Sequence, residues 1–186
     1  MRAITIQAMK KILLPLMVIF CAAVTVAAQT TQTQAPAAPA VHCPPTTTLD
    51  ELIAAIDSSI TGPADRDRTC FRDIFYPEAR LMPIGKNKEG VYEPHILTVD
   101  DWINAVAKRA PAVLGEHQIR VEKVVWAHEA HLWSTYTVDL DGKVAARGIN
   151  SIQAVNDGKR WRILSIEWQA EDDTDKVPEK FLSAGK

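Results

Sequence analysis

The second half of the chain alternates between apolar and polar residues, which is the pattern of β-strands. Four such runs follow one another between Gly115 and Glu171. The last three are separated by residues 141–142 (Asp-Gly) and 156–158 (Asn-Asp-Gly), which tolerate the positive φ of tight turns. The pattern therefore predicts four long strands that run antiparallel in a meander.

The region before these strands shows the helical spacing of apolar residues instead. Thr48 and Glu51 form a capping-box pattern at the start of a predicted helix over residues 49–60. Further helices are predicted over residues 67–76 and 98–111, and short strands over residues 79–84 and 91–97. Helices that precede an antiparallel sheet indicate an α+β domain whose sheet wraps around the helices.

Residues 1–28 have the layout of a secretory signal peptide. Lys10 and Lys11 precede an apolar run over residues 12–26, which is short for a membrane span, and small residues lead up to Ala28. Such a signal peptide would direct the protein to the periplasm or the medium, and its cleavage after Ala28 would leave no membrane span.

Three further segments are distinguished by composition. Residues 29–45 are rich in Thr, Gln, Ala and Pro, which is typical of a flexible linker. Residues 172–186 are charged and lack a pattern, so we expect a disordered tail there. The folded domain is then expected over residues 46–171.

Charge and cysteine content limit the classes of function that this chain can have. Without the signal peptide the chain keeps 18 basic and 23 acidic residues, and it has no basic stripe of the kind that nucleic-acid binding needs. Cys43 and Cys70 are the cysteines left, and an even number in an oxidising compartment favours one disulfide between them. No motif indicates a cofactor, and the spacing of His128 and His131 does not suit a metal site.

The order of these elements, together with RGINSIQ at residues 147–153 and RWRILSIEW at residues 160–168, resembles the nuclear transport factor 2-like superfamily. Within it the chain looks most like the SnoaL-like branch, which is similar to ketosteroid isomerases and polyketide cyclases. The resemblance covers about residues 49–171. It implies a cone-like, curved antiparallel sheet wrapped around three N-terminal helices, with a deep apolar pocket and often a homodimer. It does not decide the activity, because this scaffold hosts isomerases, dehydratases, epoxide hydrolases, cyclases and binding domains.

One register of the strands suggests residues that could bind a ligand. It places Arg147 opposite Tyr136 and Trp168, on the more aliphatic sheet face that also carries Ser151. On such a face Arg147 would bind an anionic or carbonyl-bearing ligand, Tyr136 would donate a hydrogen bond, and Trp168 would form a flat wall. The alternative is a structural arginine paired with Asp73 or another helix carboxylate, with the aromatic residues filling core.

The opposite sheet face is more apolar than a solvated face usually is. The residues that the same register assigns to it include Trp133, Asn150, Trp161 and Ile163. We therefore predict a homodimer that forms through this face.

Isomerase or dehydratase chemistry needs a general base inside the pocket. The candidates are Asp73 on the second predicted helix and His117 at the start of the long strands. The leading hypothesis is an exported domain that binds a small apolar or carbonyl-containing molecule, oriented by Arg147 and Tyr136. The alternatives are an isomerase or dehydratase of the ketosteroid isomerase kind and a non-catalytic dimeric interaction module. The sequence does not decide whether the protein is an enzyme.

Overall fold

The computed structural model describes residues 41–182, so the predicted signal peptide and most of the predicted linker lie outside the described residues. The helices are α1 (Leu49–Ile60), α2 (Thr69–Asp73), α3 (Val99–Ala107) and the short 3-10 helix η1 (Glu179–Phe181). The strands are β1 (Gly62–Pro63), β2 (Phe75–Lys86), β3 (Tyr92–Pro94), β4 (Val113–Trp126), β5 (Glu129–Leu140), β6 (Lys143–Asn156) and β7 (Trp161–Ala170).

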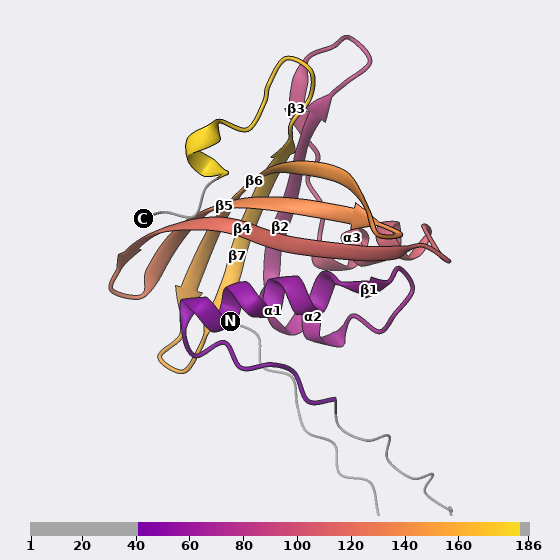
Figure 1. Cartoon of the computed structure of the whole chain (residues 1–186). Coiled ribbons are helices and arrows are strands. Elements are labelled where there is room, and N and C mark those ends of the chain that lie inside the picture. Colours follow the sequence, from indigo (N-terminus) through magenta and orange to yellow (C-terminus); the bar gives the residue numbers. More distant parts are fainter. Residues whose placement is uncertain (1–40, 183–186) are drawn as a thin grey trace, which may run out of the picture. The chain divides into compact units, whose positions relative to one another are not determined.

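The seven strands form one sheet in the order β1-β4-β5-β6-β7-β2-β3. Strands β4 to β7 are the predicted antiparallel meander, and β3 is an edge strand as Pro94 required. Strand β2 differs from expectation because it is longer than predicted and runs parallel to β7, which makes the sheet mixed. The α+β fold class is confirmed (Figure 1).

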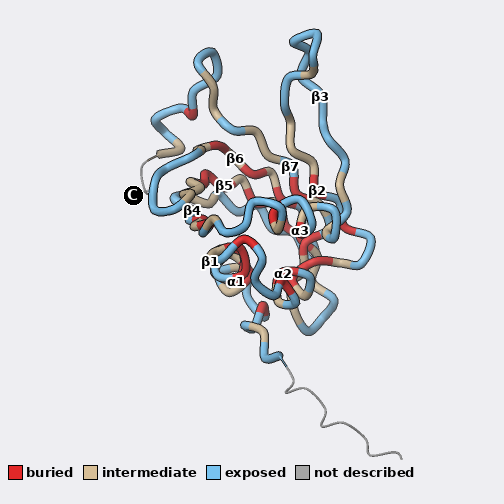
Figure 2. Tube along the Cα trace, turned by 90° about the vertical axis from the view of Figure 1, so that its right-hand side faces the viewer, coloured by how far each residue is buried: buried red, intermediate tan, exposed pale blue. Residues whose placement is uncertain are grey.

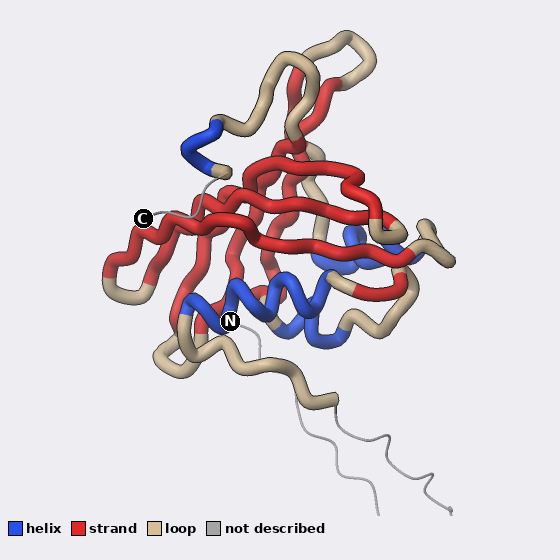
Figure 3. Tube along the Cα trace, viewed as in Figure 1, coloured by secondary structure: helices blue, strands red, loops and turns tan. Residues whose placement is uncertain are grey.

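Helices α1 and α3 begin where the sequence predicts. The side chains of Thr48 and Thr98 each accept a hydrogen bond from a backbone N–H three residues further on, in complete capping boxes. Helix α2 is shorter than predicted because Phe75 already belongs to β2. Helices α1, α2 and α3 gather on one side of the curved sheet (Figure 3), where Leu52 and Ile56 of α1 are buried in the main core. Burial is concentrated between these helices and the strands, whereas the β2–β3 hairpin is largely exposed (Figure 2).

A β-bulge in β6 overturns the predicted register between β5 and β6. The turn at Asp141 and Gly142 is the predicted one, with φ of 52° and 74°. The register then shifts by one residue beyond Asp139, so that Tyr136 pairs with Gly148 and Arg147 pairs with Thr137. The side chain of Arg147 therefore belongs to the face opposite that of Tyr136, and the predicted row of Arg147, Tyr136 and Trp168 does not exist.

The connection from β6 to β7 also differs from the prediction. Asn156 pairs with Trp161, so the loop is longer than the expected Asn-Asp-Gly turn, and a second register shift follows near Ala154. As a result Asn150, and not Arg147, pairs with Trp168. Leu164 on β7 is 47% exposed.

The C-terminal segment, where the sequence predicts a disordered tail from residue 172, packs on the outer face of the sheet up to Leu182. Val177 is buried, and its backbone N–H donates to Glu171. The Phe181 ring lies 6.3 Å from the ring of Trp133 on β5. The large outward-facing Trp133 provides the apolar surface that this segment covers. The segment is the yellow end of the ribbon in Figure 1.

Cys43 and Cys70 form a disulfide, as the sequence predicted. It ties the segment before α1 to α2. Within residues 41–182, none of the helices is long and apolar enough to cross a membrane.

Candidate functional site

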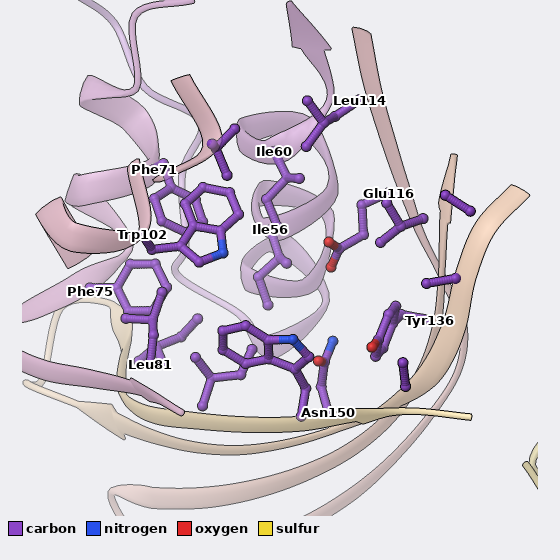
Figure 4. Close-up of a pocket in the computed structure, with 18 of the residues that line it drawn as sticks. Ile56, Ile60, Phe71, Phe75, Leu81, Trp102, Leu114, Glu116, Tyr136 and Asn150 are labelled. Atoms are coloured by element: carbon purple, nitrogen blue, oxygen red, sulfur yellow. The ribbon is translucent and has the colours of Figure 1, made fainter. Parts of the chain in front are cut away.

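A cavity of about 400 Å³ lies between the inner face of the sheet and the three helices (Figure 4). Most of its lining is aliphatic or aromatic, including Phe71 and Phe75 and the two tryptophans Trp102 and Trp168. The polar side chains that reach it are Glu116 from β4, Tyr136 from β5, Asn150 from β6 and Arg109 after α3. A mostly apolar cavity of this size with a few convergent polar groups is typical of a small-molecule site.

Glu116 is the carboxyl group of this cavity, and it is 9% exposed. Its carboxylate points into the cavity, with Ile56 on one side and Tyr136 on the other (Figure 4). Burial raises the pKa of Glu116 to about 8, and the nearby charge of Asp57 on α1 adds to this effect. Glu116 can therefore take up or release a proton near neutral pH.

Gln118 holds the Glu116 side chain in place. Its Nε2 donates to Glu116 Oε1 at 2.9 Å. Its own carbonyl oxygen accepts from the hydroxyl of Ser134 and, at 3.4 Å, from the amide of Asn150. One oxygen of the Glu116 carboxyl group is thus engaged by the protein, which leaves the other to face the cavity.

Asp57 is a second acid next to this network. One of its oxygens accepts from the backbone N–H of Gln118 at 3.2 Å, and the other, Oδ1, is buried with no partner among residues 41–182. Burial raises the pKa of Asp57. Two carboxyl groups in a poorly solvated place resist joint ionisation, which is consistent with the raised pKa of Glu116.

Tyr136 lies over a glycine on the neighbouring strand. A Cβ atom built on Gly148 would be 2.8 Å from the Tyr136 hydroxyl and 2.1 Å from the carbonyl oxygen of Gln169. Only glycine therefore leaves room at this position. Burial and the charge of Glu116 raise the pKa of Tyr136, so its hydroxyl remains protonated and can donate a hydrogen bond.

We place the mouth of the cavity where its lining residues are exposed to solvent. Among its lining residues the exposed ones are Arg109, Ala145 and Ala170. The side chain of Arg109 has no ion pair or hydrogen bond to any residue in the range 41–182. The mouth therefore combines two small side chains with one cation.

Two of the residues predicted to bind a ligand, Tyr136 and Trp168, line this cavity. Arg147 and Ser151 do not, because the bulge in β6 turns them to the outer face. Arg147 donates two hydrogen bonds to Glu171 Oε1, at 3.2 and 2.9 Å, and a third to Oε2 at 3.1 Å. Ser151 lies beside His131, 3.2 Å from its ring nitrogen.

Neither of the predicted general bases lines the cavity. Asp73 accepts two hydrogen bonds from Arg160, at 2.5 and 3.1 Å, near the start of β7. The His117 side chain is 64% exposed and lies 3.9 Å from Asp139.

The predicted dimer face does not exist as one surface. Asn150 and Ile163 line the cavity, and Trp161 is buried in the core. Trp133 does lie on the outer face, but Phe181 of the C-terminal segment packs near it. The register shifts in β6 and β7 account for the difference.

Sequence reasoning missed Glu116 and the inward position of Asn150. Glu116 and Gln118 share the inner face with Val121, which packs against the core. Strict alternation would place Glu116 and Val121 on opposite faces, but a register shift between Gln118 and Arg120 brings them together. The signal in the sequence was the polar pair Glu116 and Gln118 between the apolar residues Leu114 and Val121.

Comparison with solved structures identifies proteins that are similar to this chain. A protein with a cystatin-like fold from Nostoc punctiforme matches with a TM-score of 0.51 and 13% identity, covering 67% of this chain and 90% of that one. A protein from Novosphingobium aromaticivorans, provisionally named as the β subunit of an aromatic-ring-hydroxylating dioxygenase, matches with a TM-score of 0.52 and 14% identity, covering 68% and 89%. An NTF-2-like protein of unknown function from Silicibacter pomeroyi has a TM-score of 0.46 and 18% identity, covering 66% and 92%.

The chain shares its fold with the first two of these proteins, one of which is described as cystatin-like, and this agrees with the resemblance to the nuclear transport factor 2-like superfamily. Identities of 13% and 14% establish the fold alone, and one fold hosts many unrelated activities. No protein-family model matches the sequence, and no curated protein is similar enough to count as a relative. Function must therefore be argued from the cavity itself.

Proposed function

We propose that this protein binds a small, mostly apolar molecule with a carbonyl or hydroxyl group, and that Glu116 transfers a proton to or from it. This is chemistry of the isomerase or dehydratase kind. The observation that carries the proposal is Glu116 itself, a buried carboxyl group with a pKa of about 8 that faces an apolar cavity. A general acid or base works best when its pKa lies near the operating pH.

The neighbours of Glu116 suit a proton transfer next to a carbonyl group. In its ionised form Glu116 would remove a proton from the carbon beside the carbonyl. The electron pair of the broken C–H bond would form a C=C bond, and the π pair of the carbonyl would move onto its oxygen. Tyr136 is on the adjacent strand, with a hydroxyl that stays protonated, and it would donate a hydrogen bond to that developing oxyanion. Return of the proton from Glu116 to another carbon completes an isomerisation. The same carboxyl group could instead protonate a departing hydroxyl.

The cavity favours these readings over a pure interaction module, which would need no space for a ligand. We also propose that the protein is exported. The signal-peptide pattern of residues 1–28 and the Cys43–Cys70 disulfide support this proposal. Fractionation of cells that express the full chain should recover the protein outside the cytoplasm, with its N-terminus at Gln29.

Deuterium exchange tests the catalytic part of the proposal. β-Tetralone, a bicyclic ketone with enolisable protons, is incubated with the protein in D₂O, and exchange is followed by proton NMR. The wild type should accelerate exchange, and Glu116→Gln should lose at least about tenfold of the acceleration, because the amide keeps the shape but cannot take a proton. Glu122→Gln, on the exposed part of the same strand, is the matched control. Binding of the ketone without any acceleration would refute the proton-transfer role and leave a binding protein.

A further inference from the structure

The mouth of the cavity carries a cation without a partner. Arg109 lines the cavity, is exposed, and makes no side-chain ion pair or hydrogen bond within residues 41–182. The other exposed lining residues, Ala145 and Ala170, are small and uncharged. A group that passes them on its way out of the cavity therefore comes next to a guanidinium.

A second cation lies behind the cavity wall. Arg68 is 2% exposed, and its guanidinium carbon is 6.0 Å from the ring centre of Trp102, which lines the cavity. Its donors go to backbone carbonyl oxygens, at 2.6 Å for Ser59 and 3.2 Å for Pro63, and its Nε has no partner. No carboxylate among residues 41–182 pairs with it. A buried cation without an acid raises the local positive potential, because little solvent screens it.

The lining of the cavity does not repel an anionic ligand. Glu116 is the acidic residue in the lining, and with a pKa of about 8 it is mostly protonated, and so uncharged, at neutral pH. The remaining lining is apolar apart from Tyr136 and Asn150. Two cations thus lie at the mouth and behind Trp102, the acid in the lining is mostly uncharged, and the other nearby acid, Asp57, does not line the cavity.

We propose that the ligand of this cavity is an apolar carboxylic acid, held with its carboxylate at Arg109 and its apolar body between Trp102 and Trp168. Arg109 presents donors in the planar geometry that a carboxylate accepts. The carbonyl or hydroxyl group then lies further in, near Glu116 and Tyr136. This inference rests on the proposed function, since it names the class of molecule on which Glu116 acts.

Binding of decanoate and of its uncharged amide, decanamide, tests the inference. Affinities are measured by calorimetry at low salt for the wild type and for Arg109→Gln, Arg109→Lys and Lys108→Gln. Lys108 is the neighbouring exposed cation and does not line the cavity, so it controls for net charge. NMR shifts of the Trp102 and Trp168 indole N–H groups show whether a probe enters the cavity.

The wild type should bind decanoate about tenfold more tightly than decanamide, as expected for one charge-assisted pair. Arg109→Gln should abolish this preference, Arg109→Lys should retain part of it, and Lys108→Gln should leave it unchanged. Equal affinity of the wild type for both probes, or an equal loss in Lys108→Gln, would overturn the inference while the proposed function stands. If neither decanamide nor β-tetralone shifts the two indole signals of the wild type, the cavity does not take apolar ligands and both proposals fail.

Discussion

Gln118 donates a hydrogen bond to Glu116 across 2.9 Å on the inner face of β4. The amide cannot offer its oxygen to Glu116 instead, because Ser134 and Asn150 already donate to that oxygen. Three strands thus fix the orientation of one carboxyl group. The hydrogen bond favours the charged form of Glu116 and so works against the effect of burial on its pKa.

Replacement of Gln118 should therefore raise the pKa of Glu116 further. In Gln118→Leu the carboxyl group loses its donor and stays buried, so we expect a pKa clearly above the value of about 8 in the wild type. Carbon NMR of glutamate labelled at the side-chain carboxyl measures it directly. Gln153→Leu, at an exposed position on β6, is the matched control and should leave the titration unchanged. An unchanged or lower pKa in Gln118→Leu would show that this hydrogen bond does not govern Glu116.

The raised pKa of Glu116 also predicts how stability depends on pH. In the unfolded chain the carboxyl group has a pKa near 4.5, and in the folded protein near 8. Between these values the folded state keeps a proton that the unfolded state has lost, so the free energy of unfolding falls as pH rises. The slope from this one group is about 1 kcal/mol per pH unit. The contribution is fully present below pH 4.5 and is lost as the pH passes 8.

Urea unfolding of the wild type and Glu116→Gln at several pH values checks this prediction. The glutamine variant should lack the decline between about pH 5 and 8, because its side chain does not titrate. Glu122→Gln should decline as the wild type does. Parallel curves for the wild type and Glu116→Gln would mean that the carboxyl group titrates in the folded protein as it does in the unfolded chain.

Gly148 is predicted to be intolerant of any side chain. A methyl group there would meet the Gln169 carbonyl oxygen at 2.1 Å and the Tyr136 hydroxyl at 2.8 Å, so the β6–β7 pairing would have to shift. We expect Gly148→Ala to lower the free energy of unfolding by about 2 kcal/mol or more. Gly85→Ala, on β2 with nothing within 4 Å of the added atom, should be nearly neutral. Equal stability of the two variants would contradict the close approach.

The sequence predicted the secondary-structure elements better than it predicted which strand side chains point inward. The capping box at Thr48, the start of the third helix at Thr98 and the turn at Asp141 depend on residues close together in the chain, and the structure has them all. Which side chains of β4, β6 and β7 point inward depends on register shifts that no local residue pattern indicates. One extra residue in a strand reverses which side chains are inside. For that reason Tyr136 lies on the cavity side that the sequence indicated, Arg147 lies on the outer face, and Glu116 was overlooked.

Arg147 is instead predicted to hold the C-terminal segment. It pairs with Glu171, which also accepts from the backbone N–H of Val177 at 3.2 Å. Arg147→Ala should destabilise the protein by about 1 kcal/mol and speed hydrogen exchange at the Val177 amide. Binding of decanamide in the cavity should stay the same, because Arg147 lies on the other face of the sheet. Loss of cavity binding in Arg147→Ala with an intact fold would restore the earlier interpretation of Arg147 as a ligand-binding residue.

The disulfide is predicted to contribute to stability through the unfolded chain. Cys43 and Cys70 are 27 residues apart, and closing a loop of that length stabilises a fold by about 3 kcal/mol in the chain-entropy model. The Cys43→Ser/Cys70→Ser double variant should therefore unfold at a lower urea concentration than the wild type. Reductant should lower the urea concentration at which the wild type unfolds to that of the variant, and it should not affect the variant itself. The cavity should be unaffected, because neither cysteine lines it, so the double variant should bind decanamide as the oxidised wild type does. If reductant leaves the wild type unchanged, the bridge contributes nothing to stability, and its support for export is lost as well.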